Sequence, residues 1–119
     1  MARILLAEDD DSLRGFLASS LGRAGHEVTA CADGDEAWEV LEHGTFDLLL
    51  TDIVMPGLDG IELARRAGEV DPAMKIVFIT GFAAVALSQH QLTPRDAKVL
   101  SKPFHLKDLV AEVERVIAA

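Results

Sequence analysis

Short, mostly apolar runs recur along this 119-residue chain and alternate with segments of helical periodicity. The runs cover residues 3–7, 46–51, 75–79 and 97–101, with a shorter strand-like stretch at 27–30. Strands without polar alternation are typical of sheets that helices cover on both faces, and alternating β and α segments join parallel strands by right-handed crossovers. The pattern therefore predicts an α/β fold with a doubly wound, five-stranded parallel sheet.

The helical segments carry their own start signals. Aspartates that can cap a helix precede two of them, namely Asp10 or Asp11 and Asp59, and a further helix is expected from Asp33 to His43. Residues 82–89 are expected to form a fourth helix, and the apolar stripe that begins at Leu106 indicates a fifth. Five helices and five strands make five βα units, whereas a TIM barrel needs roughly twice this length.

Length and charge restrict the classes of function. We expect residues 1–119 to fold as a single domain, because this length is close to the commonest domain size. The net charge of −9 would repel a phosphate backbone, so no nucleic-acid partner is expected. We expect a cytoplasmic protein without a membrane segment. The chain has a single cysteine, no leader is expected, and no apolar stretch approaches the ~18 residues of a membrane span. A monomer is the default expectation.

Polar side chains stand at the carboxyl ends of four apolar runs. They are Glu8 and Asp9, Asp52, Thr80, and Lys102. Because open α/β sheets bind ligands at the carboxyl ends of their strands, these side chains are expected to gather at one edge. Clustered carboxylates repel one another unless a hard cation neutralises them, and Mg²⁺ is the usual cation where phosphate chemistry follows. The set predicts a phosphoryl-accepting site.

Each of these residues also has an ordinary interpretation. Glu8 and Asp9 alone are compatible with the acidic start of a helix, and Thr80 alone with the end of a strand. Asp10 and Asp11 are interpreted as helix-capping or solvated charges rather than ligands. The combination of acids, hydroxyl and lysine favours the site over the separate interpretations.

The spacing of these motifs resembles a known family. The motifs, in chain order, are Glu8-Asp9, Asp52 with Met55-Pro56 and Asp59-Gly60, Thr80-Gly81, and Lys102-Pro103-Phe104. Over residues 2–118 the chain resembles the response-regulator receiver domain of two-component phosphorelays, and within that family the stand-alone, single-domain type. The resemblance implies a flavodoxin-like sheet with strand order 2-1-3-4-5.

The resemblance also implies roles at the acidic edge. Asp52 would accept a phosphoryl group from the phosphohistidine of a histidine kinase or a histidine phosphotransferase. Mg²⁺ would be bound by Asp9, Asp52 and the backbone carbonyl of Val54, and Glu8 would reach it through water. The chain would then be no conventional enzyme, since it would catalyse only its own phosphorylation and dephosphorylation.

The remaining roles concern the phosphoryl group and its orientation. Lys102 and Thr80 would each bind a phosphoryl oxygen, and Pro103, in the cis form, would aim the lysine. The chain departs from many receivers at Val99, where an aromatic residue usually reports the movement of the threonine. The position two residues after the phosphoacceptor is often polar in the family, but here it is Val54. Phe82, two residues after Thr80, is also apolar, and we expect both side chains to screen an acyl phosphate from water.

The output is expected to be a change in protein contacts. Resemblance to one type of stand-alone receiver implies an adaptor of an ATP-dependent protease that acts in its unphosphorylated form. An alternative is a phosphate sink or shuttle within a phosphorelay, without an effector of its own. An aspartyl-nucleophile phosphatase is disfavoured because Val54 stands where such enzymes carry a second aspartate, and a degenerate receiver is disfavoured because the site residues are complete.

Overall fold

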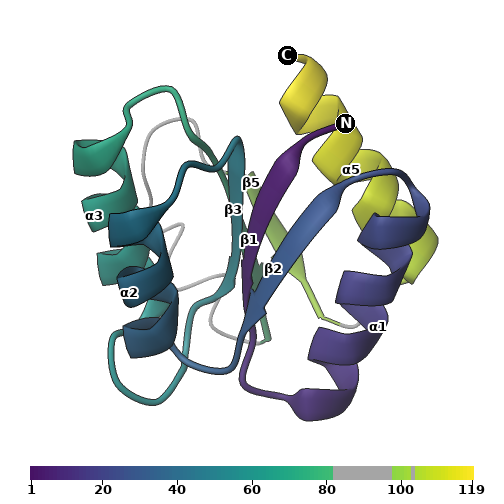
Figure 1. Ribbon diagram of the computed structural model, residues 1–119. Helices are drawn as coiled ribbons and strands as arrows, with labels where there is room; N and C mark the ends of the chain where they lie inside the picture. The colour runs from purple at the N-terminus through teal and green to yellow at the C-terminus, as the bar shows by residue number, and fades with distance from the viewer. Residues whose placement is uncertain (82–97, 103) are drawn as a thin grey trace.

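The strands form one parallel sheet in the computed structural model, which describes residues 1–81, 98–102 and 104–119 (Figure 1). The strands are β1 (Arg3–Ala7), β2 (Glu27–Cys31), β3 (Leu48–Asp52), β4 (Lys75–Thr80) and β5 (Lys98–Ser101). Their order across the sheet is β2-β1-β3-β4-β5, and all four neighbouring pairs are parallel. The predicted doubly wound sheet and its 2-1-3-4-5 order are therefore confirmed.

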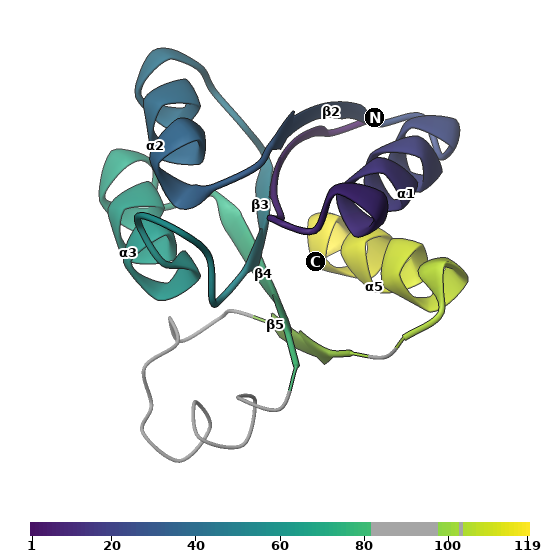
Figure 2. The same ribbon diagram turned by 90° about the horizontal axis from the view of Figure 1, so that it is seen from below.

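Helices cover both faces of the sheet. The described helices are α1 (Asp11–Arg23), α2 (Gly34–His43), α3 (Gly60–Val70) and α5 (Leu106–Ala118). Figure 2 shows α1 and α5 on one face and α2 and α3 on the other. The helix expected over residues 82–89 lies outside the described residues, as does Pro103.

Three of these helices begin behind a capping aspartate. In each case a carboxylate oxygen accepts a hydrogen bond, 2.8 to 3.0 Å long, from the amide three residues later, and the caps are Asp10, Asp33 and Asp59. Such a cap satisfies one of the amides that a helix start leaves without a partner. The cap Asp10, before α1, directly follows Glu8 and Asp9. The cap Asp59, before α3, ends the loop that begins after Asp52.

The central strands alternate their side chains between two apolar clusters. Ile4 and Leu6 of β1 pack with α1 and α5, whereas Leu5 and Ala7 pack with α2 and α3. Because both faces are covered, every residue of β3 is buried, while the edge strand β5 is only half-buried to exposed. This explains the continuous apolar runs. In the described part of the chain, no helix has the length and apolar character needed to span a membrane.

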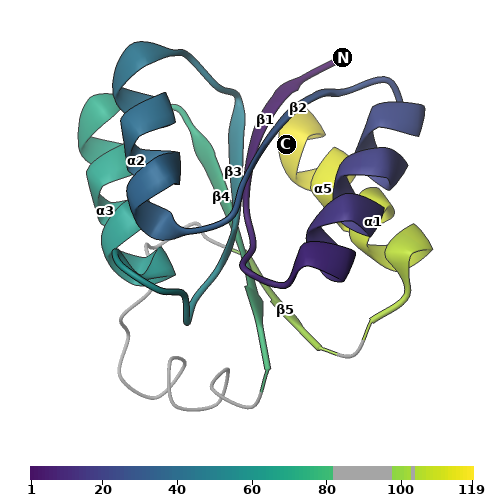
Figure 3. The same cartoon turned by 60° about the horizontal axis from the view of Figure 1, so that its bottom comes forward.

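The strands end at a common edge, which lies at the bottom of Figure 3. The pairing sets Ala7 beside Thr51, Asp52 beside Ile79, and Thr80 beside Ser101. From β1 the chain crosses to β2 on one side and then to β3 on the other, so the order reverses between β1 and β3. A doubly wound sheet leaves a crevice at the carboxyl ends of such a pair.

Candidate functional site

Three carboxylates meet at this crevice. Glu8 and Asp9 follow β1 and Asp52 ends β3, and each offers one oxygen such that the three oxygens lie within 4.8 Å of one another. Glu8 is 0% exposed and Asp52 is 7% exposed, whereas Asp9 is exposed to solvent. The structure thus gathers the acids that the sequence placed at one edge.

Glu8 is the most deeply held of the three. Its amide donates a hydrogen bond to the carbonyl of Cys31 at 3.1 Å, and its Oε2 accepts one from the amide of Asp10 at 3.1 Å. Its Oε1 is buried and has no hydrogen-bond partner among the described residues, although the Nζ of Lys102 lies 3.3 Å away. Burial raises the pKa of Glu8 to about 7; the Asp10 amide opposes the rise and the charge of Asp52 adds to it. A buried carboxylate oxygen that faces an ammonium group but accepts no hydrogen bond from the described residues is suited to receive a cation or a proton.

Asp52 is held by the backbone around it. Its Oδ1 accepts a hydrogen bond from the amide of Ile53 at 2.8 Å, and its Oδ2 lies 3.2 Å from the Nζ of Lys102. The chain then folds back, so that the amide of Gly60 donates to the carbonyl of Ile53 at 2.8 Å. A Cβ at Gly60 would collide with the backbone carbonyl of Asp52. Only glycine allows α3 to begin this close to the backbone of Asp52.

Lys102 is the cation that faces the acids. Its Nζ contacts both Asp52 and Glu8, and its side chain is 31% exposed. Burial favours the neutral amine, but the two carboxylates outweigh it and raise the pKa of Lys102 above its ordinary value. The amide of Lys102 donates to the carbonyl of Thr80 at 2.7 Å. This bond ties the lysine to the end of β4, where Thr80 is buried.

The other residues predicted for the site are also placed around it. Val54 lies two residues beyond Asp52, and its side chain is 72% exposed to solvent. Val99 is half-buried in β5 and packs against the apolar cluster under α2 and α3. Phe82 and Pro103 lie outside the described residues.

Sequence reasoning missed Arg14. This α1 residue donates from Nη1 to the carbonyl of Glu8 at 3.0 Å and from Nη2 to Oδ1 of Asp11 at 2.7 Å. A bond to a backbone carbonyl leaves no mark in the pattern of residue types. The available signal is its position one turn after Asp10, the capping residue that follows the acidic pair.

The group of acids fits Mg²⁺. The donor set consists of carboxylate oxygens, and two of the carboxylates belong to buried residues. One buried oxygen accepts no hydrogen bond from residues 1–81, 98–102 or 104–119. Mg²⁺ prefers one or two protein carboxylates together with waters, and the exposed side of the crevice at Asp9 leaves access for water. Residues Glu8, Asp9 and Asp52 are therefore suited to hold this ion.

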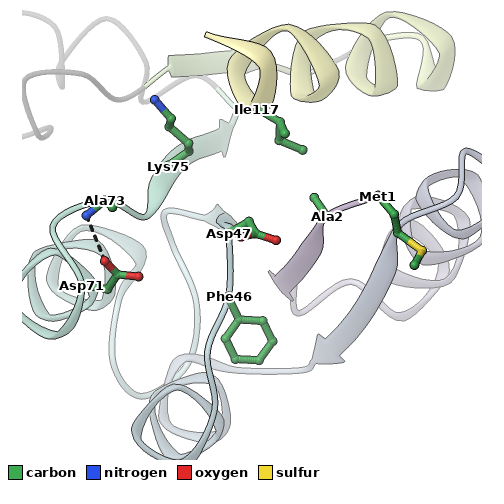
Figure 4. A pocket seen from close by; sticks show the side chains of 8 residues that line it. All are labelled: Met1, Ala2, Phe46, Asp47, Asp71, Ala73, Lys75 and Ile117. Carbon is green, nitrogen blue, oxygen red and sulfur yellow. Dashed lines mark hydrogen bonds between the residues drawn. The ribbon is translucent and has the colours of Figure 1, made fainter.

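A separate hollow lies at the opposite edge of the sheet (Figure 4). It has a volume of about 320 Å³ and is lined at the amino ends of the strands by Met1, Ala2, Phe46, Asp47, Asp71, Ala73, Lys75 and Ile117. Asp71 there uses its Oδ1 to accept a hydrogen bond from the amide of Ala73 at 3.0 Å. The length of the strands separates this hollow from the three acids.

Fold and site together define a receiver domain. The family model described as "Response regulator receiver domain" matches residues 4–114, so the chain belongs to this family. Its members are signalling domains of two-component systems rather than conventional enzymes, and the resemblance drawn from the motifs is confirmed.

Individual relatives place the chain within the family. It is 62% identical to the response regulator receiver protein CpdR of Brucella abortus (strain 2308), over 100% of this chain and 99% of that protein. It is 37% identical to part of the sensor kinase CckA of the same organism, over 98% of this chain and 12% of the kinase. The crystal structure of a response regulator receiver protein from Sinorhizobium medicae WSM419 has a TM-score of 0.92 and 38% identity, over 98% of this chain and 94% of that one. The chain is therefore CpdR-like.

Proposed function

We propose that this chain is a phosphorylation-controlled switch in which Asp52 is the phosphoacceptor. The observation that carries the proposal is the position of the Asp52 carboxylate, which lies between two further acids and the Nζ of Lys102 at the carboxyl edge of the sheet. This carboxylate stands at the carboxyl edge of the sheet, where ligands of such folds bind, with the positive charge of Lys102 3.2 Å away. Residues 4–114, the range of the family match, contain the whole site.

The reaction is an in-line displacement at phosphorus. A carboxylate oxygen of Asp52 forms a bond to phosphorus, the P–N bond of the donor phosphohistidine breaks, and its electron pair returns to the imidazole. Lys102 is placed to stabilise negative charge on a phosphoryl oxygen, and Thr80 to donate a hydrogen bond to another. Pro103 would set the direction of the lysine.

Metal binding completes this proposal. Asp9 and Asp52 would be carboxylate ligands of Mg²⁺, the carbonyl of Val54 a third ligand, and Glu8 a ligand through water. When bound, Mg²⁺ supplies positive charge that neutralises the acids and the phosphoryl oxygens. The buried Oε1 of Glu8 supports this assignment, because its one positively charged neighbour among the described residues, the Nζ of Lys102 at 3.3 Å, is shared with Asp52.

The donor and the effector are both proteins in this proposal. A histidine kinase or histidine phosphotransferase would supply the phosphoryl group, and the similarity to a segment of a sensor kinase supports a phosphorelay setting. The effector would be an ATP-dependent protease, with the unphosphorylated chain as its adaptor. High identity with CpdR over the full match supports a role shared with that protein. The cytoplasmic location and monomeric state expected from the sequence remain part of the proposal.

Phosphorylation can shift the equilibrium between two conformations of the protein only if the phosphoryl group interacts more favourably with one of them than with the other. Thr80 ends β4 and Lys102 directly follows β5, and the amide of Lys102 donates a hydrogen bond to the carbonyl of Thr80. A displacement of either side chain by the phosphoryl group would therefore act on the ends of β4 and β5 together. Since Val99 replaces the usual aromatic residue, we infer that the output is a shift of backbone or helix rather than the rotation of a ring.

A pull-down tests the effector. The protease would be captured with wild-type chain, with Asp52→Ala, and with wild type treated with Mg²⁺ and a small phosphodonor. We expect the untreated wild type and Asp52→Ala to retain the protease and the treated wild type to release it. Equal retention in all three samples, together with transfer of the phosphoryl group to a histidine phosphotransferase, would instead support the sink or shuttle.

A further inference from the structure

Arg14 occupies an unusual position for a cation next to a metal-binding site. Its guanidinium bonds the backbone carbonyl of Glu8 at 3.0 Å, rather than a carboxylate of the acidic group. A second nitrogen pairs with Asp11 at 2.7 Å, and the side chain is only 23% exposed. The fork of an arginine can bind two acceptors in a fixed geometry, so this residue ties the start of α1 to the end of β1.

The carbonyl that Arg14 binds belongs to a peptide unit fixed from several directions. The amide of Glu8 donates to Cys31 of β2 at 3.1 Å, and its side chain accepts from the amide of Asp10 at 3.1 Å. The hydrogen bond from Arg14 fixes the carbonyl of Glu8, which belongs to the peptide bond between Glu8 and Asp9. Asp9 itself is exposed, so the position of its carboxylate depends on the backbone that carries it.

Charge and geometry make opposite predictions for this arginine. A positive charge near a cation site opposes the binding of a second cation, so on electrostatic grounds alone the loss of Arg14 would strengthen Mg²⁺ binding. We propose that Arg14 is instead a positioning residue, which holds the Glu8–Asp9 backbone in the geometry that lets the three acids bind Mg²⁺ together. This proposal rests on the proposed function of the same site. Outer partners of metal ligands typically contribute a factor of 10 to 100 in affinity.

The test compares three variants in Mg²⁺ titration calorimetry at fixed ionic strength. Arg14→Met keeps the aliphatic stem and removes the donors, and we expect it to weaken Mg²⁺ binding about 10-fold. Arg14→Lys keeps the charge and one donor nitrogen in place of two, and should recover most of the affinity. Arg23→Ala is the matched control, because it removes a positive charge from the exposed last turn of the same helix. It should change the affinity less than about twofold.

Amide hydrogen exchange in the metal-free protein gives a second readout. We expect the amide of Asp10 to exchange faster in Arg14→Met and at the wild-type rate in Arg23→Ala. Unchanged or tighter Mg²⁺ binding by Arg14→Met, or unchanged exchange at Asp10, overturns the positioning role. If the wild type itself binds no Mg²⁺, the proposed function fails, and the exchange rates still decide whether Arg14 holds this backbone.

Discussion

The Nζ of Lys102 lies 3.2 Å from Oδ2 of Asp52, so the residue after β5 and the last residue of β3 form an ion pair across β4. The same Nζ lies 3.3 Å from a buried oxygen of Glu8. One amine thus faces two carboxylates in the metal-free protein. It holds the acids together at the place where a phosphoryl group and a cation would later share them.

Removal of this amine should destabilise the metal-free protein. We expect Lys102→Ala to lower the free energy of unfolding by about 1–2 kcal/mol at pH 8, because two carboxylates with little exposure lose their counter-ion. The cost stays below that of a fully buried ion pair because the lysine side chain is partly exposed. Saturating Mg²⁺ should reduce this loss of unfolding free energy in the variant, since a bound cation stabilises the folded state by mass action. Urea unfolding with and without Mg²⁺ measures both quantities. Lys107→Ala, at an exposed position of α5, is the control, and a deficit that Mg²⁺ leaves unchanged would contradict the prediction.

Glu8 should make the metal-free protein less stable as the pH rises. Its pKa of about 7 in the folded protein exceeds the ordinary value of 4.5, so the folded state binds the proton more tightly than the unfolded state does. The resulting stability is fully present below pH 4.5 and is lost as the pH rises through about 7. Urea midpoints of wild type and Glu8→Gln at pH 5 and pH 8 test this. The variant should lack this part of the pH dependence, and an identical dependence in both proteins would refute the assignment.

Two glycines of α3 should respond in opposite ways to alanine. A Cβ at Gly60 collides with the carbonyl of Asp52, whereas a Cβ at Gly68 meets no atom within 4 Å. We expect Gly60→Ala to cost about 1–3 kcal/mol and to weaken Mg²⁺ binding, because the acceptor residue must shift. Gly68→Ala should be neutral or stabilise by up to about 1 kcal/mol, since alanine is the better helix former. If Gly60→Ala and Gly68→Ala changed stability and Mg²⁺ affinity to the same extent, the close contact between Gly60 and the carbonyl of Asp52 would be unimportant.

Val54 should influence the lifetime of the acyl phosphate. Its exposed side chain lies two residues after Asp52 and carries no polar group that could orient water. We expect Val54→Asn to shorten the lifetime several-fold, because one hydrogen bond to the attacking water is worth about 1 kcal/mol, or a factor of about five in rate. Decay of the phosphorylated protein in Mg²⁺ can be followed by intact mass. An unchanged decay rate in the variant would remove this role for Val54.

The sequence predicts the sheet and the gathering of acids well, for identifiable reasons. Side chains buried on both faces produce the apolar runs of β1, β3 and β4, and such runs indicate parallel strands. Aspartates before helices predict the caps. The exact bounds are harder to predict, because Asp52 and Thr80 were expected just beyond their strands and instead end β3 and β4.

Finer features of the site depend on tertiary contacts. Glu8 and Asp9 are chemically similar neighbours, yet one is fully buried with a raised pKa and the other is exposed. Arg14 acts on a backbone carbonyl, and Gly60 is needed because a carbonyl approaches it closely. None of these relationships follows from residue types alone, since each depends on where a second segment of the chain passes.

Intact mass spectrometry after treatment with Mg²⁺ and a small phosphodonor tests the central claim most directly. Wild type, Asp52→Ala and wild type with a metal chelator would be compared under the same conditions. The account predicts a single phosphoryl adduct on wild type in Mg²⁺, and none on Asp52→Ala or in the chelated sample. An adduct of equal yield on Asp52→Ala, or no adduct on folded wild type in Mg²⁺, would contradict the assignment of Asp52 as the phosphoacceptor.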